Sequence, residues 1–199
     1  MSRAKVQAGG IIRTSLDNTW KTPQYVLDAA RAYFGGPIPF DAATASDNPT
    51  DALRFAALPV GTLQGPSLFP EPERVGTLQG PDGLSMSWDW PTWCNPPYGE
   101  HLKAWLGKMT AEGRRGAEIL ALVPCSRWEQ AYFTDVLGAA NALCFHRGRI
   151  AFISSIDNVP VEGNPSASMF LGFNVDVERF REAFTPLGAC FALRALGAA

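Results

Sequence analysis

Apolar residues recur along this chain of 199 residues at two distinct spacings. Spacings of three and four residues, which predict amphipathic helices, cover residues 23–34, 100–115, 126–137 and 176–184. Continuous apolar runs, which predict buried strands, cover residues 37–40, 117–123, 142–145, 149–153, 167–173 and 190–193, and a further run ends at Asn95. This alternation predicts one α/β domain, with helices on both faces of a mostly parallel sheet. The last strands lack intervening helices, so we expect an antiparallel hairpin at one edge.

Capping residues predict where two of the helices begin and where one ends. Thr22 is a favourable N-cap, and Pro23 suits the first helical position. Gly35-Gly36 ends the same helix. Ser126 and Glu129 have the three-residue spacing of a capping box, which predicts a second helix start.

Residues 48–90 form the least regular region, because proline and glycine recur throughout it. The segment 60–66 returns unchanged as 75–81, which indicates a local duplication too short for a solenoid unit. Either part of the sheet is reduced here or short strands escape the pattern. Long irregular segments are usually functional or mobile, so we expect this region to face the substrate or to act as a lid. Residues 1–16 are predicted to be a loose arm, which leaves 17–199 as the domain.

The stretch from Thr92 to Gly99 is expected to join a strand to a helix through a stiff bend. Pro96 and Pro97 fix φ at about −65° and remove two backbone donors. Asn95 is pushed out of the α region because a proline follows it. The bend therefore holds an amide, bare carbonyls and the ring of Tyr98 at the carboxyl end of a strand, where open α/β sheets bind ligands. A simple turn is the alternative interpretation of Asn-Pro-Pro.

Such a bend suits an exocyclic amine as substrate. The lone pair of this amine is delocalised, which makes the nitrogen a poor nucleophile. The side-chain oxygen of Asn95 and the carbonyl of Pro96 could accept from its two N–H bonds and favour a more tetrahedral nitrogen. The ring of Tyr98 could stack on the planar group, an interaction worth about 1–3 kcal/mol per base.

The segment Asn95-Pro96-Pro97-Tyr98 resembles the catalytic motif of S-adenosylmethionine-dependent amino methyltransferases. Three further pieces make the wider pattern similar to the phage-type DNA N6-adenine methyltransferase family. They are Trp20-Lys21-Thr22-Pro23, Phe40-Asp41-Ala42-Ala43, and Asp82-Gly83-Leu84 with Trp88. The resemblance covers about residues 20–173, which is most of the chain.

The resemblance implies a Rossmann-like methyltransferase domain and a role for each piece. The catalytic residues would be Asn95, Pro96, Pro97 and Tyr98, and the cofactor residues would be Trp20, Thr22, Pro23, Asp41, Ala42, Ala43, Asp82, Leu84 and Asn95. Structural roles remain open, namely an anchor at Trp20, a cap or turn at Asp41 and a Pro-Asp-Gly turn at Asp82. Many methyltransferases have a glycine-rich cofactor loop, from which Asp41-Ala42-Ala43 departs.

The activity implied by the resemblance is site-specific methyl transfer from S-adenosylmethionine to the N6 amine of adenine in double-stranded DNA, without a metal. Enzymes of this kind belong to phages, prophages and restriction-modification systems. Cytosine N4, RNA guanine N2 and protein glutamine remain alternative targets. Cytosine enzymes more often place serine before Pro-Pro, and glutamine methylases are expected to need a separate substrate domain. A catalytically silent DNA-binding or nucleotide-binding relative is a further alternative, and the oligomeric state stays open.

The formal net charge of −2 is less basic than is usual for a nucleic-acid-binding protein. DNA contacts would therefore depend on local groups. Arg147 and Arg149 follow a predicted strand and are candidate phosphate contacts, whereas Arg114-Arg115 is interpreted as a solvated face. The loops 50–81 and 154–166 are candidates for reading the DNA sequence.

The four cysteines are far apart and the chain has two histidines, which argues against a metal site. We expect reduced, buried thiols in a cytoplasmic protein. No apolar run reaches the roughly 18–20 residues of a membrane span. The N-terminal residues show no signal-peptide pattern.

Overall fold

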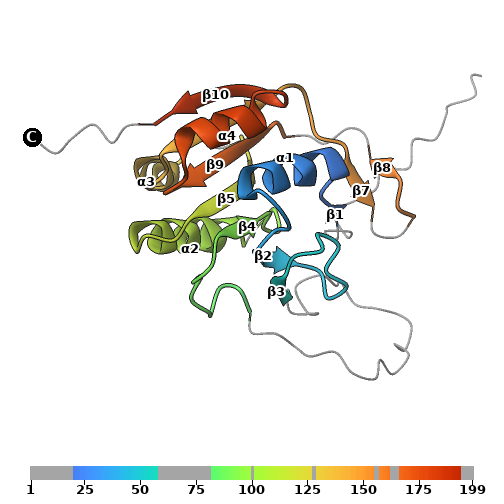
Figure 1. The fold of residues 1–199 in the computed structure, drawn as a ribbon. Helices are drawn as coiled ribbons and strands as arrows, with labels where there is room; N and C mark the ends of the chain where they lie inside the picture. Colours follow the sequence, from blue (N-terminus) through green and yellow to red (C-terminus); the bar gives the residue numbers. More distant parts are fainter. Residues whose placement is uncertain are drawn as a thin grey trace, which may run out of the picture.

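The computed structural model describes residues 20–57, 82–99, 101–126, 129–154, 157–161 and 166–193. Within these ranges the chain forms a seven-stranded sheet, a three-stranded sheet and four helices (Figure 1). The arm expected at residues 1–16 and both copies of the short repeat lie outside the described residues.

The large sheet has the strand order β10-β6-β9-β5-β4-β2-β3. Its strands are β2 Phe40–Thr44, β3 Arg54–Ala57, β4 Thr92–Cys94, β5 Ile119–Pro124, β6 Ala142–His146, β9 Ser168–Phe173 and β10 Gly188–Ala192. Parallel pairing joins β3 to β2, β2 to β4 and β4 to β5. Strand β9 is antiparallel to both β5 and β6, so β6 runs in the same direction as β5. Strand β10 is antiparallel to β6 and forms one edge. The sheet is therefore parallel in one half and antiparallel in the other.

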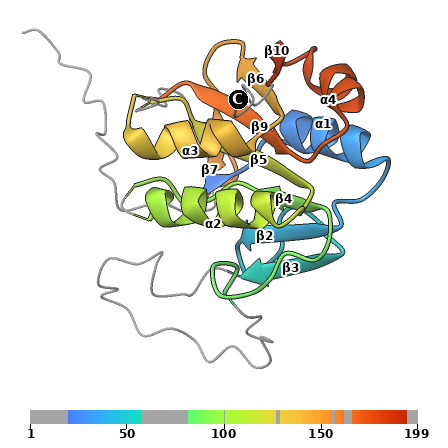
Figure 2. The ribbon, with the colours of Figure 1, turned by 90° about the vertical axis from the view of Figure 1, so that its left-hand side faces the viewer.

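Helices cover both faces of this sheet, as the sequence predicts. They are α1 Gln24–Phe34, α2 Leu102–Arg114, α3 Ala131–Ala139 and α4 Val177–Phe184. Helices α1 and α4 lie on one face, and α2 and α3 lie on the other (Figure 1, Figure 2). One core contains Phe180 of α4 together with Trp93 of β4. The other contains Trp105 of α2 and Phe133 of α3.

Three local features explain how helices end or pack here. Gly35 ends α1 with φ at 71°, a left-handed conformation that glycine adopts without steric cost. The Asp176 side chain caps α4 by accepting a hydrogen bond from the Arg179 backbone N–H. A Cβ on Gly113 would lie 2.8 Å from Phe173 Cδ1, so a glycine at this position lets α2 pack closely on β9.

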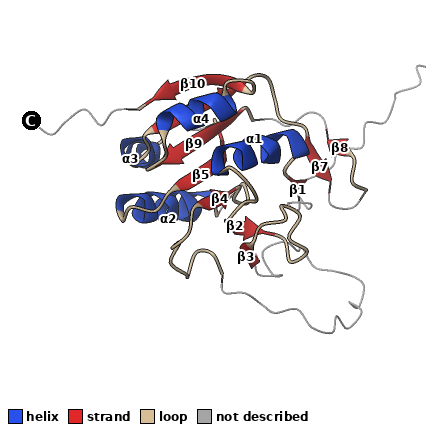
Figure 3. Cartoon of the chain, in the orientation of Figure 1, coloured by secondary structure: helices blue, strands red, loops and turns tan. Residues whose placement is uncertain are grey.

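The three-stranded sheet has the order β1-β7-β8, with every pairing antiparallel. It is formed by β1 Trp20–Lys21, β7 Phe152–Ser154 and β8 Pro160–Val161. It lies at the right of Figure 1, on the side toward which β2 points, and Figure 3 shows its strands apart from the large sheet. The antiparallel pairing expected at one edge of the main sheet is confirmed for β9, β6 and β10, whereas β7, which was expected to belong to that edge, pairs with β1 and β8 in this second sheet. The strand expected at residues 149–153 begins later, at Phe152.

Strand β3 and the start of α3 differ from the sequence-based expectations. Strand β3 lies inside the region interpreted as irregular, and it escapes the hydrophobic pattern because Arg54 and Phe55 are exposed on an open edge. Helix α3 begins at Ala131, with Gln130 as its N-cap and no side-chain capping bond. The capping box expected at Ser126 is therefore wrong, and the Ser126 hydroxyl is instead paired with the hydroxyl of Ser166.

The positions of Asp41 and of the α1 cap also differ from expectation. The strand expected to run from Pro37 to Asp41 begins at Phe40 and continues to Thr44, so Asp41 is its second residue and not its end. Pro23, not Thr22, is the N-cap of α1, and no side chain caps this helix. Two backbone N–H groups of the first turn, from Val26 and Leu27, donate to the Pro23 carbonyl. The Thr22 hydroxyl is thereby left for another partner.

All four cysteines are free thiols, two of them buried and two half-buried. The buried ones are Cys94 and Cys144, so the expectation of burial is correct for those two only. None of the helices in the described part of the chain is long and apolar enough to cross a membrane.

Candidate active site

The predicted site residues lie at the carboxyl edge of the large sheet. Strands β2, β4 and β5 run in parallel and end at this edge with Thr44, Cys94 and Pro124. Strand β9 runs the other way, so it begins here, with Ser168 opposite Pro124. Asn95 follows β4 directly, which places the bend where an open α/β sheet presents residues to a ligand.

The Asn95 side chain is held at one end only. Its amide nitrogen donates a hydrogen bond of 3.0 Å to the Thr22 hydroxyl, which is 73 residues away in sequence. Its oxygen, Oδ1, is buried and has no hydrogen-bond partner among the described residues. Pro96 is buried behind it. The bend therefore presents an unused acceptor from a fixed amide.

Tyr98 packs against an aromatic pair from the small sheet. Its ring meets Phe152 edge-on, with centroids 5.9 Å apart at 88°, and Phe152 meets Trp20 at 6.1 Å and 74°. Its hydroxyl is buried without a hydrogen-bond partner in the described structure, although the ring remains partly exposed. Burial raises the pKa of Tyr98, and the nearby Ser168 hydroxyl opposes this only in part. The phenol is therefore neutral, with an uncharged ring available for stacking.

Buried polar atoms without partners are concentrated at this edge. In the described part of the chain they are Thr44 Oγ1, Trp93 Nε1, Asn95 Oδ1, Tyr98 Oη and Ser168 Oγ. Apart from the Trp93 indole, all of them stand at the end of β2, in the bend after β4 or at the start of β9. Buried polar groups in native proteins are nearly always hydrogen-bonded to protein, ligand or ordered water, so this cluster is a candidate place for a ligand.

Asp41 is buried in β2, and its carboxylate is used within the protein. One oxygen accepts from the Ala43 backbone N–H at 3.0 Å and the other from the Thr50 hydroxyl at 2.7 Å. Burial raises the pKa of Asp41 to about 6, and these two hydrogen bonds, together with the nearby Thr44 hydroxyl, oppose the rise. The Cys94 thiol lies close enough that the Asp41 charge adds to burial in raising the pKa of Cys94. Through these two hydrogen bonds, Asp41 joins the end of β2 to Thr50 in the loop that follows it.

The segment from Asp82 to Leu84 packs directly on the predicted cofactor loop. A Cβ on Gly83 would lie 2.0 Å from the Ala42 carbonyl oxygen, so only glycine allows this approach. The Gly83 carbonyl accepts from the Trp88 indole at 2.8 Å. Asp82 Oδ1 accepts from the Leu84 backbone N–H at 3.1 Å, which forms the predicted turn. The two predicted cofactor pieces therefore lie side by side.

The N-terminal piece joins the same region through Lys21. Its ammonium group lies 3.6 Å from the Asp47 carboxylate, in the loop after β2, and donates to Asn158 at 3.3 Å. Together with the Thr22–Asn95 hydrogen bond, this contact brings residues 20–23 to both the cofactor loop and the bend. Three pieces far apart in the sequence therefore converge on one edge.

The two predicted phosphate contacts lie further along this edge. Arg147 and Arg149 are exposed and follow β6, which ends at the same edge as β5. The structure shows no contact between these two arginines and the bend among the residues that it describes. Two hollows lined by described residues, of about 490 Å³ beside α1 and about 300 Å³ beside Trp88, include no residue of the bend.

Sequence reasoning did not single out Thr44, Phe152 or Ser168 as site residues. Each lies in a strand of apolar and small residues, where its pattern matches that of ordinary core positions. Only the strand order places Ser168 beside the end of β5, and only the small sheet places Phe152 against Tyr98. No group of three His, Cys, Asp or Glu side chains is placed to hold a metal ion in the described residues.

A protein-family model described as DNA N-6-adenine-methyltransferase (Dam) matches residues 78–185. Since this match covers more than half of the chain, the chain belongs to that family. Family membership implies a DNA adenine methyltransferase. A search of curated proteins found no match. The family match includes the bend and Asp82-Gly83-Leu84, whereas residues 20–23 and 40–43 precede it. Their link to the site comes from the contacts described above.

Proposed function

We propose that this protein transfers a methyl group from S-adenosylmethionine to the N6 amine of adenine in DNA, at the bend formed by Asn95, Pro96, Pro97 and Tyr98. The observation that carries the proposal is the buried Oδ1 of Asn95, which has no partner in the described structure and lies in the same bend as a neutral phenol ring. Family membership supplies the reaction class. The arrangement of the residues supplies their roles.

Asn95 and the Pro96 carbonyl would hold the reacting amine. Two acceptors match the two N–H bonds of an exocyclic amine, and pairing with them favours a nitrogen whose lone pair is less delocalised. Because Pro97 fixes the backbone after Pro96, the carbonyl needs little reorganisation when the amine arrives. The main contribution of the protein is therefore to position and polarise the amine.

Tyr98 would stack on the target base. A base inside a duplex cannot reach the bend, so it must leave the helical stack at a cost of a few kcal/mol. Stacking on a partly exposed aromatic ring offsets about 1–3 kcal/mol of this cost. The edge-on contact with Phe152 fixes the plane of the Tyr98 ring before the base arrives.

The residues around β2 would form the site for S-adenosylmethionine. S-adenosylmethionine, when bound, supplies an electrophilic methyl group. Asp82, Leu84 and the backbone of Ala42 and Ala43 would hold it, together with the backbone of residues 20–23. Asp41 would support this loop from within the protein, because its carboxylate oxygens already accept from Ala43 and Thr50. The support for this fit is the packing of Gly83 on the Ala42 carbonyl and the unpartnered Thr44 hydroxyl at the strand end.

We further infer a Rossmann-like methyltransferase sheet. The supporting observation is the order β3-β2-β4-β5-β9-β6, in which every strand except β9 runs in one direction. Arg147 and Arg149, at the end of β6, would contact DNA phosphates on the same edge as the bend. The loops 50–81 and 154–166 would supply any preference for a DNA sequence.

The test is to incubate the protein with methyl-labelled S-adenosylmethionine and unmodified duplex DNA, and then to digest the DNA to nucleosides. We expect labelled N6-methyldeoxyadenosine, and label that accumulates about 10²–10³-fold more slowly with an Asn95→Ala control. Labelled N4-methyldeoxycytidine would reassign the target base. An absence of label, together with no thermal stabilisation by the cofactor, would identify a silent relative, because a bound ligand must stabilise the folded state.

A further inference from the structure

Thr22 is joined to the bend by a contact that the resemblance does not imply. Its hydroxyl accepts from the Asn95 amide nitrogen at 3.0 Å, while the other end of the amide stays unpartnered in the described structure. The resemblance gives the stretch 20–23 a cofactor role through its backbone. The Thr22 hydroxyl is not needed for that role, nor does it cap α1.

An asparagine amide can face a ligand with either of its ends. Half a turn about the last side-chain bond exchanges an acceptor oxygen for a nitrogen with two donors. A donor facing an amine would repel it, so activity requires the oxygen to face the substrate and the nitrogen to find an acceptor behind it. A hydroxyl can accept, whereas an alkyl side chain cannot. The Thr22 hydroxyl is the acceptor that the structure provides.

The backbone around Thr22 makes this hydroxyl a rigid support. Lys21 pairs with Ile153 in the small sheet and contacts Asp47. On the other side, Pro23 is buried and starts α1 with φ at −61°. Threonine is itself stiff at χ1, because it is branched at Cβ. An anchor held on both sides can fix the orientation of a side chain 73 residues away.

We propose that Thr22 is a positioning residue for the methyl transfer, holding the Asn95 amide so that its oxygen faces the reacting amine. This inference rests on the proposed function. Thr22 acts through Asn95 and does not need to touch the base. It therefore contributes to turnover after both substrates are bound, and not to the affinity for either of them.

The decisive experiment compares Thr22→Val with Thr22→Ser. Valine keeps the shape without an acceptor, and serine keeps the acceptor. We expect Thr22→Val to lower kcat by about 10- to 100-fold, the size typical of losing a group that orients an active-site side chain without touching the substrate, and Thr22→Ser to stay within about threefold of the unmodified protein. The KM for DNA and the calorimetric Kd for S-adenosylhomocysteine are expected to be unchanged in both variants.

Thr110→Val is a control for the loss of a hydrogen-bonded threonine hydroxyl elsewhere in the fold. The Thr110 hydroxyl donates to the Leu106 carbonyl inside α2, in a turn that is part of the helix and not of the bend. This variant should keep kcat. If Thr22→Val does not fold by circular dichroism, Thr22→Ala takes its place, since it also lacks the acceptor and relieves any crowding.

A weaker Kd for S-adenosylhomocysteine with an unchanged kcat at saturation would make Thr22 a cofactor residue and overturn the proposal. Unchanged kinetics in Thr22→Val would overturn it as well. In an Asn95→Ala background, Thr22→Val should have no further effect on the residual rate, whereas a general structural role would give an additional loss. If the unmodified protein methylates no adenine, the proposed function fails, and the positioning role fails with it.

Discussion

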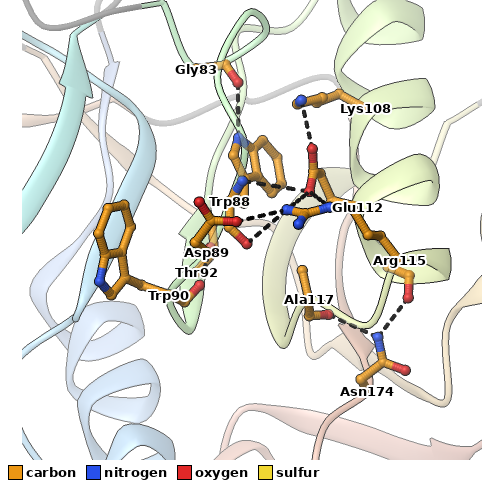
Figure 4. Close-up of polar contacts among 11 residues, drawn as sticks. Gly83, Trp88, Asp89, Trp90, Thr92, Lys108, Glu112, Arg115, Ala117 and Asn174 are labelled. Atoms are coloured by element: carbon orange, nitrogen blue, oxygen red, sulfur yellow. Dashed lines mark hydrogen bonds and ion pairs between the residues drawn. The ribbon is translucent and has the colours of Figure 1, made fainter.

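Two polar clusters stand at opposite edges of the same sheet, and they differ in how completely their hydrogen bonds are satisfied. At the amino edge, buried Glu112 accepts from Lys108 at 2.7 Å and from Arg115 Nε at 2.9 Å (Figure 4). Arg115 also contacts Asp89 at 3.1 Å, and the backbone N–H of Trp88 points at Glu112 from 3.5 Å. At the carboxyl edge, Asn95, Tyr98 and Ser168 leave buried oxygens without partners among the described residues.

This difference matches the two roles that we propose within one domain. The amino-edge cluster holds elements together, and the carboxyl-edge cluster receives a ligand. Satisfied buried polar groups hold elements together, and Glu112 links α2 to the segment that leads into β4 (Figure 4). Unsatisfied ones lower stability and persist where a ligand supplies the missing bonds. Burial alone would raise the pKa of Glu112, but the bonds from Lys108 and Arg115 outweigh it and lower the pKa. Variants at the two edges should therefore affect different measurements.

Asn95→Ala should have the largest effect, and it should act on turnover. It removes the unpartnered acceptor, which we expect to lower kcat by about 10²–10³-fold, or about 3–4 kcal/mol of transition-state stabilisation. The melting temperature should change by only about 2–4 °C, since a single hydrogen bond of about 1 kcal/mol is lost. Single-turnover kinetics and calorimetry measure the two quantities separately. A normal kcat in this variant would show that Asn95 takes no part in the reaction. It would also show that the two edges do not differ in function.

Asp41→Asn tests a group at the carboxyl edge that is hydrogen-bonded but fully desolvated. The pKa of Asp41 is about 6 in the folded protein, against an ordinary value of 3.8. The contribution of the protonated carboxyl is thus fully present below about pH 4 and is lost as the pH rises through about 6. At about 1.4 kcal/mol per pKa unit, the total loss is about 3 kcal/mol. Urea unfolding of both proteins from pH 4 to 7 should therefore show the asparagine variant gaining stability relative to the unmodified protein. Parallel curves would show that Asp41 ionises normally.

Much of the fold could be predicted from the sequence where local signals agree with core periodicity. Strand β5 is an unbroken apolar run, and all six of its residues are buried. Helix α4 has both an Asp176 cap and a regular apolar face, and it was expected at nearly the observed residues. Short elements on an open edge give no such agreement, and β3 was missed for that reason.

The candidate site could be predicted only in part. Its motif consists of consecutive residues, whereas the residues around the motif come from distant parts of the sequence. The bend is readable from four consecutive residues. The partner of Asn95 is not, because Thr22 looks like a helix cap until the fold brings the two together. Ser168 looks like a strand residue until strand order sets it beside Pro124. The sequence predicts the candidate bend, whereas the strand order and the contacts between distant segments supply the residues that surround it.

Glu112→Gln should have a moderate effect, and it should act on stability. Glutamine keeps the size of the side chain but loses the charge that pairs with Lys108 and Arg115. We expect a loss of about 2 kcal/mol, which is a fall of about 4–8 °C in melting temperature for a domain of this size. Because the pKa of Glu112 is lowered, the loss should be present above about pH 4.5 and disappear at lower pH, where the unmodified carboxylate is also protonated. Methyl transfer by the folded variant should match that of the unmodified protein, and a specific loss of kcat would contradict the division between the edges.

Ser168→Ala should have the smallest effect. The informative result is whether it raises or lowers the free energy of unfolding. The Ser168 hydroxyl is buried close to the Tyr98 hydroxyl, but it makes no hydrogen bond of normal geometry in the described structure, so its removal should relieve a desolvation cost and break no well-formed bond. We expect the variant without ligand to be as stable as the unmodified protein, or more stable by up to about 1 kcal/mol. If the hydroxyl bonds to a ligand, the stabilisation by saturating S-adenosylhomocysteine or by duplex DNA should shrink by a similar amount. Denaturant unfolding with and without each ligand measures both quantities. A variant that is less stable without ligand would mean that the Ser168 hydroxyl already has a partner. The polar groups at the carboxyl edge would then be as fully hydrogen-bonded as those around Glu112.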